Sequence, residues 1–142
     1  MISFIFSFNP WLRKTLAIFY LAVVAILSLM PASDLPRIAI FRDIDLEVHL
    51  TVHFFMYLGL SILVCWSLGV DRNRMAPIYG LLTGAFFYGV LMEILQRTIH
   101  NGRQFMFKDM LANLIGASVG LIVYRYLDKL RVAEELKANE KL

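Results

Sequence analysis

Four long apolar runs, separated by short polar stretches, dominate the pattern of hydrophobic and polar positions along the chain. They cover about residues 11–30, 50–70, 75–95 and 109–126. Each run falls in the range of about 17–25 residues that an α-helix needs to cross the hydrocarbon core of a bilayer. The pattern therefore predicts an all-α fold, a polytopic membrane helix bundle with about four transmembrane helices in a single domain, 1–142. Residues 127–142 are rich in Glu and Lys and are predicted to form a cytoplasmic tail, as a frayed or solvated helix.

Composition supports this class. The chain is 59% hydrophobic and only 18% charged, whereas a soluble domain is typically about a quarter charged. The rival interpretation of the first run is a cleaved signal peptide, but a cut after Ala32 would follow Met30 and Pro31, which do not form a small-residue cleavage site. We therefore expect an uncleaved helix. Cys65 is the single cysteine, so an internal disulfide is excluded.

The distribution of lysine and arginine predicts the orientation. With both termini cytoplasmic, nine basic residues lie inside and five lie outside. The inner set is Arg13, Lys14, Arg72, Arg74, Arg125, Lys129, Arg131, Lys137 and Lys141, and the outer set is Arg37, Arg42, Arg97, Arg103 and Lys108. Because cytoplasmic segments carry the excess of positive charge, we expect a multi-pass membrane protein with both termini inside. The charge suits contact with lipid headgroups, and we expect no nucleic-acid partner.

In this orientation, polar residues of three spans converge on the outer leaflet. They are His49 and His53 in the second span, Glu93 and Gln96 in the third, and Asp109 and Asn113 in the fourth. A charge at the centre of a membrane helix costs about 2.5–3.5 kcal/mol on insertion scales, so such side chains usually face the bundle interior and are functional candidates. The adjoining loop supplies Arg103 as a counter-charge. The inner halves of the spans show no comparable cluster.

Small residues share helical faces with these polar ones. Asp109, Asn113, Gly116 and Gly120 fall within about 60° of one face, and Ala85, Gly89, Glu93 and Gln96 share a face of the third span. Faces with small residues four apart allow helix backbones to approach closely in membranes. A simple antiparallel hairpin would place Gly89 opposite Gly116 and Ala85 opposite Gly120. We therefore expect these four residues to hold the third and fourth spans together.

The same residues resemble a known family. Glu93-x-x-Gln96, followed by Arg103, Asp109, Asn113, Gly116 and Gly120, is similar to the signature of VanZ-like membrane proteins, and His53 matches a histidine of that family's second span. The resemblance covers roughly residues 46–126. It implies a place in the bacterial cytoplasmic (inner) membrane and a link to the cell envelope. The founding member is an accessory determinant of resistance to the glycopeptide teicoplanin, which acts on cell-wall precursors at the outer face of the cytoplasmic membrane.

Three classes of function fit these residues. The first is an accessory or binding protein whose ligand-binding residues are His53, Glu93, Gln96, Arg103, Asp109 and Asn113. Its partners would be membrane lipids, a lipid-linked cell-wall intermediate or an amphiphilic antibiotic. The second is an intramembrane enzyme acting on a lipid-linked substrate, with Glu93, His53 and Asp109 as candidate catalytic acids and bases. The third is a structural scaffold without a ligand. We favour the first and consider an enzyme the less expected outcome.

A metal site is the remaining alternative. His49 and His53 lie four residues apart on one helical face, and Glu93 could supply a third ligand. The first histidine lacks the neighbouring glutamate of a His-Glu-x-x-His zinc motif. We therefore expect no metal and no other cofactor.

Overall fold

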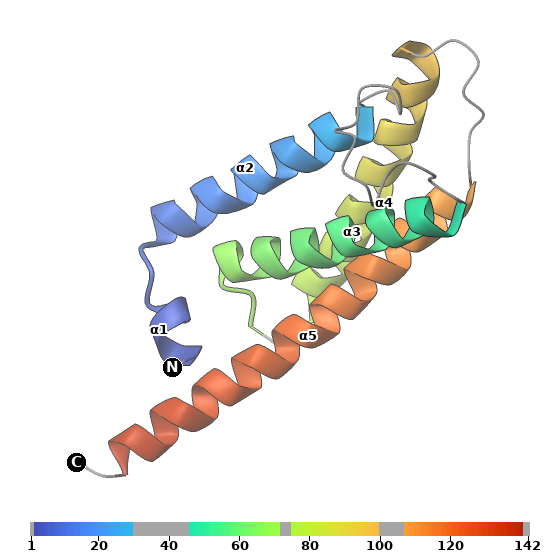
Figure 1. Ribbon diagram of the computed structural model, residues 1–142. Coiled ribbons are helices and arrows are strands. Elements are labelled where there is room, and N and C mark those ends of the chain that lie inside the picture. The colour runs from blue at the N-terminus through green and yellow to red at the C-terminus, as the bar shows by residue number, and fades with distance from the viewer. Residues whose placement is uncertain (1, 30–45, 72–74, 100–106, 141–142) are drawn as a thin grey trace.

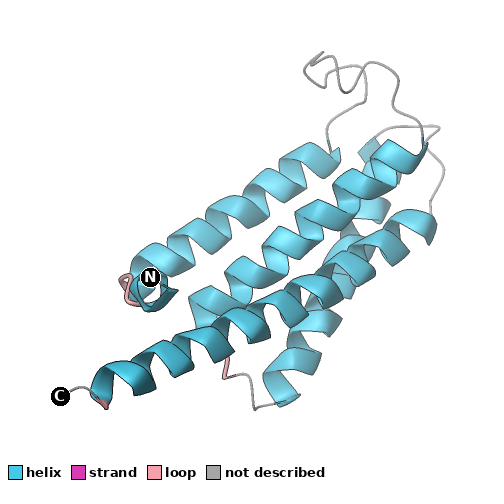
Figure 2. Cartoon of the chain, turned by 60° about the horizontal axis from the view of Figure 1, so that its bottom comes forward, coloured by secondary structure: helices cyan, strands magenta, loops and turns pink. Residues whose placement is uncertain are grey.

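The computed structural model describes residues 2–29, 46–71, 75–99 and 107–140. These residues form five helices: α1 (Ile2–Phe6), α2 (Pro10–Leu29), α3 (Leu46–Leu68), α4 (Met75–Ile99) and α5 (Phe107–Asn139). All regular structure in these ranges is helical, which confirms the all-α fold class. In Figures 1 and 2 the four long helices run roughly along one another as a bundle, and the short α1 lies near its lower end.

Four helices are long and apolar enough to cross a membrane, and they correspond to the four predicted spans. The candidate spans are Pro10–Leu29, Leu50–Leu68, Ala76–Ile99 and Phe107–Asn139. At the C-terminal side, the predicted tail is helical and continues α5 as one helix to Asn139. The short helix α1 lies outside all four predicted spans, and it packs against the C-terminal part of α5.

Local sequence signals set the ends of two helices. At the start of α2, the Asn9 side chain accepts a hydrogen bond from the Trp11 backbone N–H at 2.8 Å, and Pro10 occupies the first helical position, where a missing N–H does no harm. At the end of α3, Gly69 adopts φ +59°. The N–H groups of Gly69 and Val70 then bond back to the carbonyls of Trp66 and Cys65, which is the Schellman pattern of a glycine-capped helix.

The closest helix contact joins α3 to α5. A Cβ atom added at Gly116 would lie 3.1 Å from the Cα of Phe54 and closer still to the Phe54 carbonyl oxygen. One turn further, a Cβ at Gly120 would collide with the Leu58 carbonyl oxygen and the Ser61 hydroxyl. Two glycines four residues apart therefore let the two backbones touch, as small-residue faces do in membranes.

The sequence-derived partner of these glycines was wrong. Gly116 and Gly120 pack on α3 and not on Gly89 and Ala85 of α4. Gly89 instead faces the side chains of Asn113 and Tyr57, and Ala85 lines a cavity between helices. The hairpin prediction failed because it paired consecutive helices, whereas α5 makes its most extensive contact with α3.

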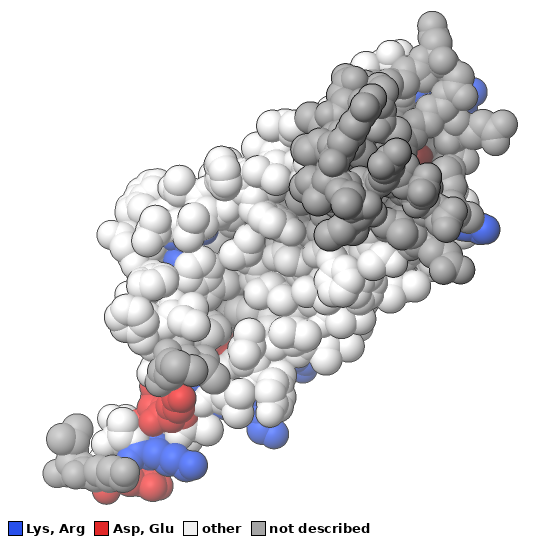
Figure 3. Space-filling view, in the orientation of Figure 1, with Lys and Arg blue, Asp and Glu red and all other residues white. Residues whose placement is uncertain are grey.

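Both termini of the described chain lie at the same end of the bundle (Figure 1). On the face seen in Figure 3, charged side chains gather near that end, and the middle of the bundle is covered by uncharged atoms. Charge near one end, an uncharged middle and four long apolar helices fit a bundle that crosses a hydrocarbon layer. The position of a residue along the long axis of the bundle therefore corresponds to its depth in the membrane.

Candidate functional site

Five polar side chains gather inside the bundle at the end opposite the termini, and we call them the distal polar cluster. They are His53 of α3, Glu93 and Gln96 of α4, and Asp109 and Asn113 of α5. Each of these residues is at most 5% exposed. The predicted convergence of three helices is thus realised, and every member points into protein.

The α3 and α5 members of the distal polar cluster are directly bonded. The Nδ1 atom of His53 lies 3.0 Å from the Oδ1 atom of Asn113. With the amide oxygen as acceptor, Nδ1 carries the proton and Nε2 keeps its lone pair, so Asn113 would fix both the tautomer and the orientation of the imidazole.

Glycine makes room for α4 to join the pair. A Cβ at Gly89 would lie 3.1 Å from the Nδ2 atom of Asn113 and 3.4 Å from the Tyr57 hydroxyl. Tyr57 is 1% exposed, and its hydroxyl has no hydrogen-bond partner among the described residues. Glu93 stands one turn beyond Gly89 on α4. Gly89 is therefore a spacer that brings the α4 backbone next to two polar groups, and not a contact point between helix backbones.

Gln96 connects the distal polar cluster to α2. Its amide Nε2 donates to the backbone carbonyl of Ser28, near the end of α2. A buried amide that bonds a backbone carbonyl in this way is well placed to hold two helices together. Among the predicted binding residues, Gln96 therefore has the clearest structural role.

The two carboxylates of the distal polar cluster occupy opposite helix ends. Asp109 lies in the first turn of α5, where the partial positive charge of the helix N-terminus favours a carboxylate. Glu93 lies toward the C-terminal end of α4, where the helix dipole disfavours one. Local structure therefore explains the buried Asp109 better than it explains the buried Glu93.

Two predicted contributors cannot be placed against this geometry. Arg103 lies outside the described residues, and so does the side chain of His49. Within the part of the chain that the structure describes, no three His, Cys, Asp or Glu side chains form a group suited to a metal ion. What the described residues assemble is a hydrogen-bonding site with two acids and one histidine.

An apolar cavity of about 450 Å³ adjoins the distal polar cluster between α2, α3 and α4. Tyr57 and Tyr88 lie on its wall near the cluster, and Leu68 and Pro77 line it toward the opposite end of the bundle. From Tyr57 to Leu68 the wall follows eleven residues of α3, or about 16 Å at the usual helical rise. Gly80 and Gly84 open the α4 side, since a Cβ at either would meet no atom within 4 Å.

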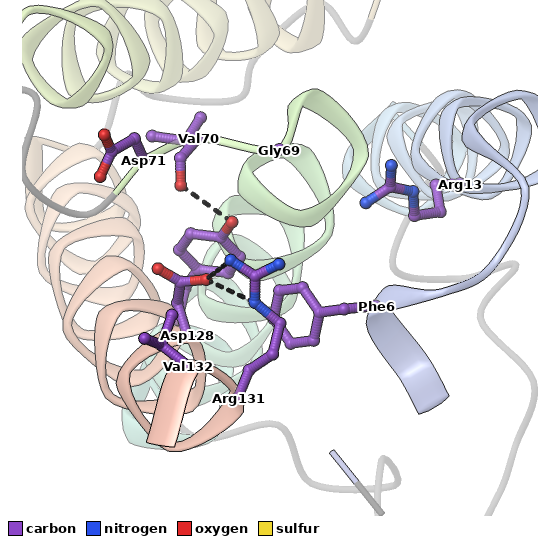
Figure 4. A pocket seen from close by; sticks show the side chains of 9 residues that line it. Phe6, Arg13, Gly69, Val70, Asp71, Asp128, Arg131 and Val132 are labelled. Atoms are coloured by element: carbon purple, nitrogen blue, oxygen red, sulfur yellow. Dashed lines mark hydrogen bonds and ion pairs between the residues drawn. The ribbon is translucent and has the colours of Figure 1, made fainter. Parts of the chain in front are cut away.

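A second polar site, at the end near the termini, was missed by the sequence analysis. Asp128 of α5 is 4% exposed and accepts two contacts from Arg131, at 3.0 and 2.8 Å (Figure 4). Arg13 of α2 donates to the Trp66 carbonyl at 3.1 Å. The spacing of Asp128 and Arg131 suggests a solvated helix pair, and Phe6, Arg13 and Val70 line the cavity beside it. Both residues lie beyond the predicted fourth span, so the expectation that the inner halves of the spans lack a polar cluster stays a prediction.

Together, the four apolar helices and their enclosed polar groups define a multi-pass helical membrane protein. No family model, curated protein or solved structure matches the chain. Its own geometry is therefore the basis for any assignment of function.

Proposed function

We propose that this protein is a VanZ-like accessory or binding protein that holds a membrane amphiphile at the outer face of the bacterial cytoplasmic membrane. The observation that carries this proposal is the position of Tyr57, which lines the apolar cavity and whose hydroxyl lies beside Gly89, the glycine that also faces Asn113 of the distal polar cluster. Envelope lipids, lipid-linked cell-wall intermediates and glycopeptide-type antibiotics share the required chemistry, a polar group joined to a hydrocarbon chain.

The shape of the site suits such a ligand. An apolar tail would lie along the cavity wall formed by α3 and α4, where Gly80 and Gly84 leave room. The polar group would then reach the Tyr57 hydroxyl, which lacks a described partner, and the neighbouring His53–Asn113 pair. Ligand sites are commonly apolar cavities with a few convergent polar groups, which is the combination found here.

The acidic residues give the polar end its selectivity. Glu93 and Asp109 would accept hydrogen bonds from hydroxyl, amide or ammonium groups of the ligand, as carboxylates do. In our proposal Arg103 contributes from the adjoining loop as the anion-binding member, because its planar guanidinium suits a phosphate or carboxylate. Burial strengthens each of these contacts, since competing water is scarce.

One observation favours an enzyme as the second candidate. Asn113 fixes His53 so that Nε2 can act as a base, and Glu93 lies buried one turn from the Gly89 spacer. A lipid-linked substrate seated in the cavity could then exchange a proton with His53 or Glu93. Turnover of a bound lipid-linked substrate by the purified protein, lost on His53→Gln, would favour this candidate over a binding protein.

A cavity-filling substitution tests the proposed ligand site. Gly84→Leu adds a side chain where the structure has open space, so it should leave the fold intact and displace a tail. We expect native mass spectrometry in mild detergent to show co-purified amphiphile on the parent protein and at least about tenfold less on Gly84→Leu, as for loss of several buried methylenes. The neighbouring Thr83→Leu, on an exposed position of the same helix, is the matched control. Equal occupancy in all three proteins would contradict the proposal.

The outer location rests on the bias in basic residues and has its own test. In a Cys65→Ser background, a Gly102→Cys variant should react with a membrane-impermeant maleimide added to intact cells, because the loop after α4 is proposed to face outward. A cysteine at Lys137, proposed to be cytoplasmic, should react only after the membrane is opened. The reverse pattern would place the distal polar cluster on the cytoplasmic side.

A further inference from the structure

A cavity of about 300 Å³ lies at the end of the bundle near the termini, remote from the distal polar cluster. Its walls come from α1, α2, the segment that follows α3 and the C-terminal part of α5 (Figure 4). Four charged side chains line it: Arg13, Asp71, Asp128 and Arg131. We call it the proximal cavity.

Arg13 presents an unused donor in the proximal cavity. Its Nη1 atom donates to the Trp66 carbonyl at 3.1 Å, which fixes the guanidinium in place. Its Nε–H group is buried and has no acceptor among the described residues. A buried donor without an acceptor is costly, and a bound oxyanion would satisfy it with a charge-assisted hydrogen bond.

The opposite side of the proximal cavity is acidic. The described contacts of Asp128 both fall on its Oδ1 atom, from Nε and Nη2 of Arg131, so its second oxygen faces no described donor. Asp71 lines the same space. These carboxylates would repel a purely anionic ligand, and they would accept hydrogen bonds from a primary ammonium group. The cavity is therefore built for opposite charges placed close together.

The surroundings place the proximal cavity at the depth of lipid headgroups. Trp66 and Phe8 pack edge to face, with ring centroids 6.2 Å apart, and the Trp66 indole N–H donates to the Ile5 carbonyl. Trp11 is exposed at the start of α2. Tryptophan concentrates at the boundary between hydrocarbon and water, so the cavity opens where phosphate and amine groups of lipids lie.

We propose that the proximal cavity binds the headgroup of a phospholipid that carries both a phosphate and a primary ammonium group, of the phosphatidylethanolamine type. The phosphate accepts from the guanidinium of Arg13, and the ammonium donates to Asp128 and Asp71. This site is separate from the amphiphile site of the proposed function, so either can fail without the other.

Stepwise N-methylation of the lipid tests the ammonium contact on the unaltered protein. Delipidated protein in mild detergent is titrated with phosphatidylethanolamine, its mono- and dimethyl forms, phosphatidylcholine and phosphatidylglycerol of matched chains, and bound lipid is counted by native mass spectrometry. We expect affinity to fall along the methylation series, by about tenfold in all, because each methyl removes one N–H donor. Phosphatidylglycerol should bind as weakly as phosphatidylcholine. Equal affinities across the set would overturn the proposal.

Substitutions locate the binding at the proximal cavity. Asp128→Asn keeps the side-chain shape and should abolish the preference for phosphatidylethanolamine over phosphatidylcholine, while Arg13→Gln should weaken both by about tenfold. Arg125→Gln, at an exposed position one turn before Asp128 on α5, is the matched control and should change neither affinity. An unchanged preference in Asp128→Asn, or an equal loss in Arg125→Gln, would contradict the assignment.

A competition experiment distinguishes a lipid from a soluble ligand of the same chemistry. Glycerophosphoethanolamine carries the phosphate and ammonium without acyl chains. We expect it to displace the lipid only at concentrations at least about a hundredfold higher, because acyl contacts add to the affinity. Displacement at concentrations equal to those of the lipid would show that the bilayer is not the source of the ligand.

Discussion

The two helices that flank α3, α5 and α4, each carry a pair of glycines four residues apart, and the two pairs have opposite roles. Toward α5, Gly116 and Gly120 bring backbone against backbone, and the contact is closed. Toward α4, Gly80 and Gly84 face open space, and the contact is a cavity. A glycine pair four residues apart therefore does not by itself indicate a helix interface. The difference lies in the distance to α3. The glycines of α5 meet the carbonyls of Phe54 and Leu58, whereas those of α4 lie away from α3.

The comparison divides the bundle into a closely packed pair, α3 and α5, and a loosely packed pair, α3 and α4. Polar cross-links tie α4 to its neighbours at several points along its length. They are the Gln96 bond to Ser28, the Tyr88 hydroxyl bond to the Leu21 carbonyl, and the spacer contact of Gly89 with Asn113. All three points lie in the C-terminal half of α4, and the cavity separates α4 from α3 along its N-terminal half, from Pro77 to Tyr88. The proposed ligand would therefore lie beside the half of α4 that has fewer ties to its neighbours.

The largest effect is expected at the closed contact. Gly116→Leu forces a branched side chain into the Phe54 backbone, which cannot rotate away as a side chain can. We expect a loss of about 3 kcal/mol or more of stability, seen as low membrane abundance and aggregation in detergent. Gly84→Leu is the control at the open contact and should accumulate like the parent.

Equal abundance of Gly116→Leu and Gly84→Leu would break the comparison, because it would mean that α3 and α5 are not in backbone contact. Gly120→Leu is a second test of the same contact, since its Cβ would meet both the Leu58 carbonyl and the Ser61 hydroxyl.

The two acids of the distal polar cluster should separate stability from function. Asp109→Ala removes a carboxylate from the first turn of α5 and should cost about 1 kcal/mol of stability, as loss of a favourable helix-dipole contact does. Glu93→Gln keeps the shape and should retain normal abundance, yet abolish the phenotype of the intact gene in a test of tolerance to envelope-directed antibiotics. Membrane abundance and phenotype are measured on both variants. Full phenotype in Glu93→Gln would make the distal polar cluster a scaffold.

The smallest effect on folding is expected at Tyr57. Its hydroxyl has no described partner, so Tyr57→Phe should change the melting temperature of the empty protein by only a degree or two. Amphiphile binding should nevertheless weaken several-fold if the hydroxyl contacts the polar group. Tyr88→Phe removes a hydroxyl that is bonded to the Leu21 carbonyl and should lower stability more. A larger loss of stability in Tyr57→Phe than in Tyr88→Phe would contradict the assignment of the Tyr57 hydroxyl as the group without a partner.

Membrane-crossing helices were the most predictable part of the fold, because length and apolarity are properties of a single segment. The convergence of His53, Glu93 and Asn113 was also predictable, since the direction of successive spans fixes which helix ends meet. The helix partner of Gly116 was not predictable in this way. It depends on which non-consecutive helices pack together, and nothing local in α5 distinguishes α3 from α4.

Asp128 illustrates a second limit. Arg125 and Lys129, close to it on α5, are charged and exposed, so the sequence indicates a solvated helix face. The burial of Asp128 arises from Phe6, Arg13 and Val70, which come from three other parts of the chain. Long-range enclosure of this kind leaves no periodic signal, and a polar site built by it can be recognised only in three dimensions.

The contact between α1 and α5 has a consequence for synthesis of the protein in the cell. The Ser3 backbone N–H and hydroxyl both bond to the Glu134 carboxylate, at 3.1 and 3.2 Å, across 131 positions of sequence. During translation α1 can make this contact only after the C-terminal part of α5 has left the ribosome, because Glu134 is made 131 residues after Ser3. Closure of the proximal cavity by α1 is therefore one of the late steps of folding, and a nascent chain interrupted before Glu134 would leave α1 without this partner.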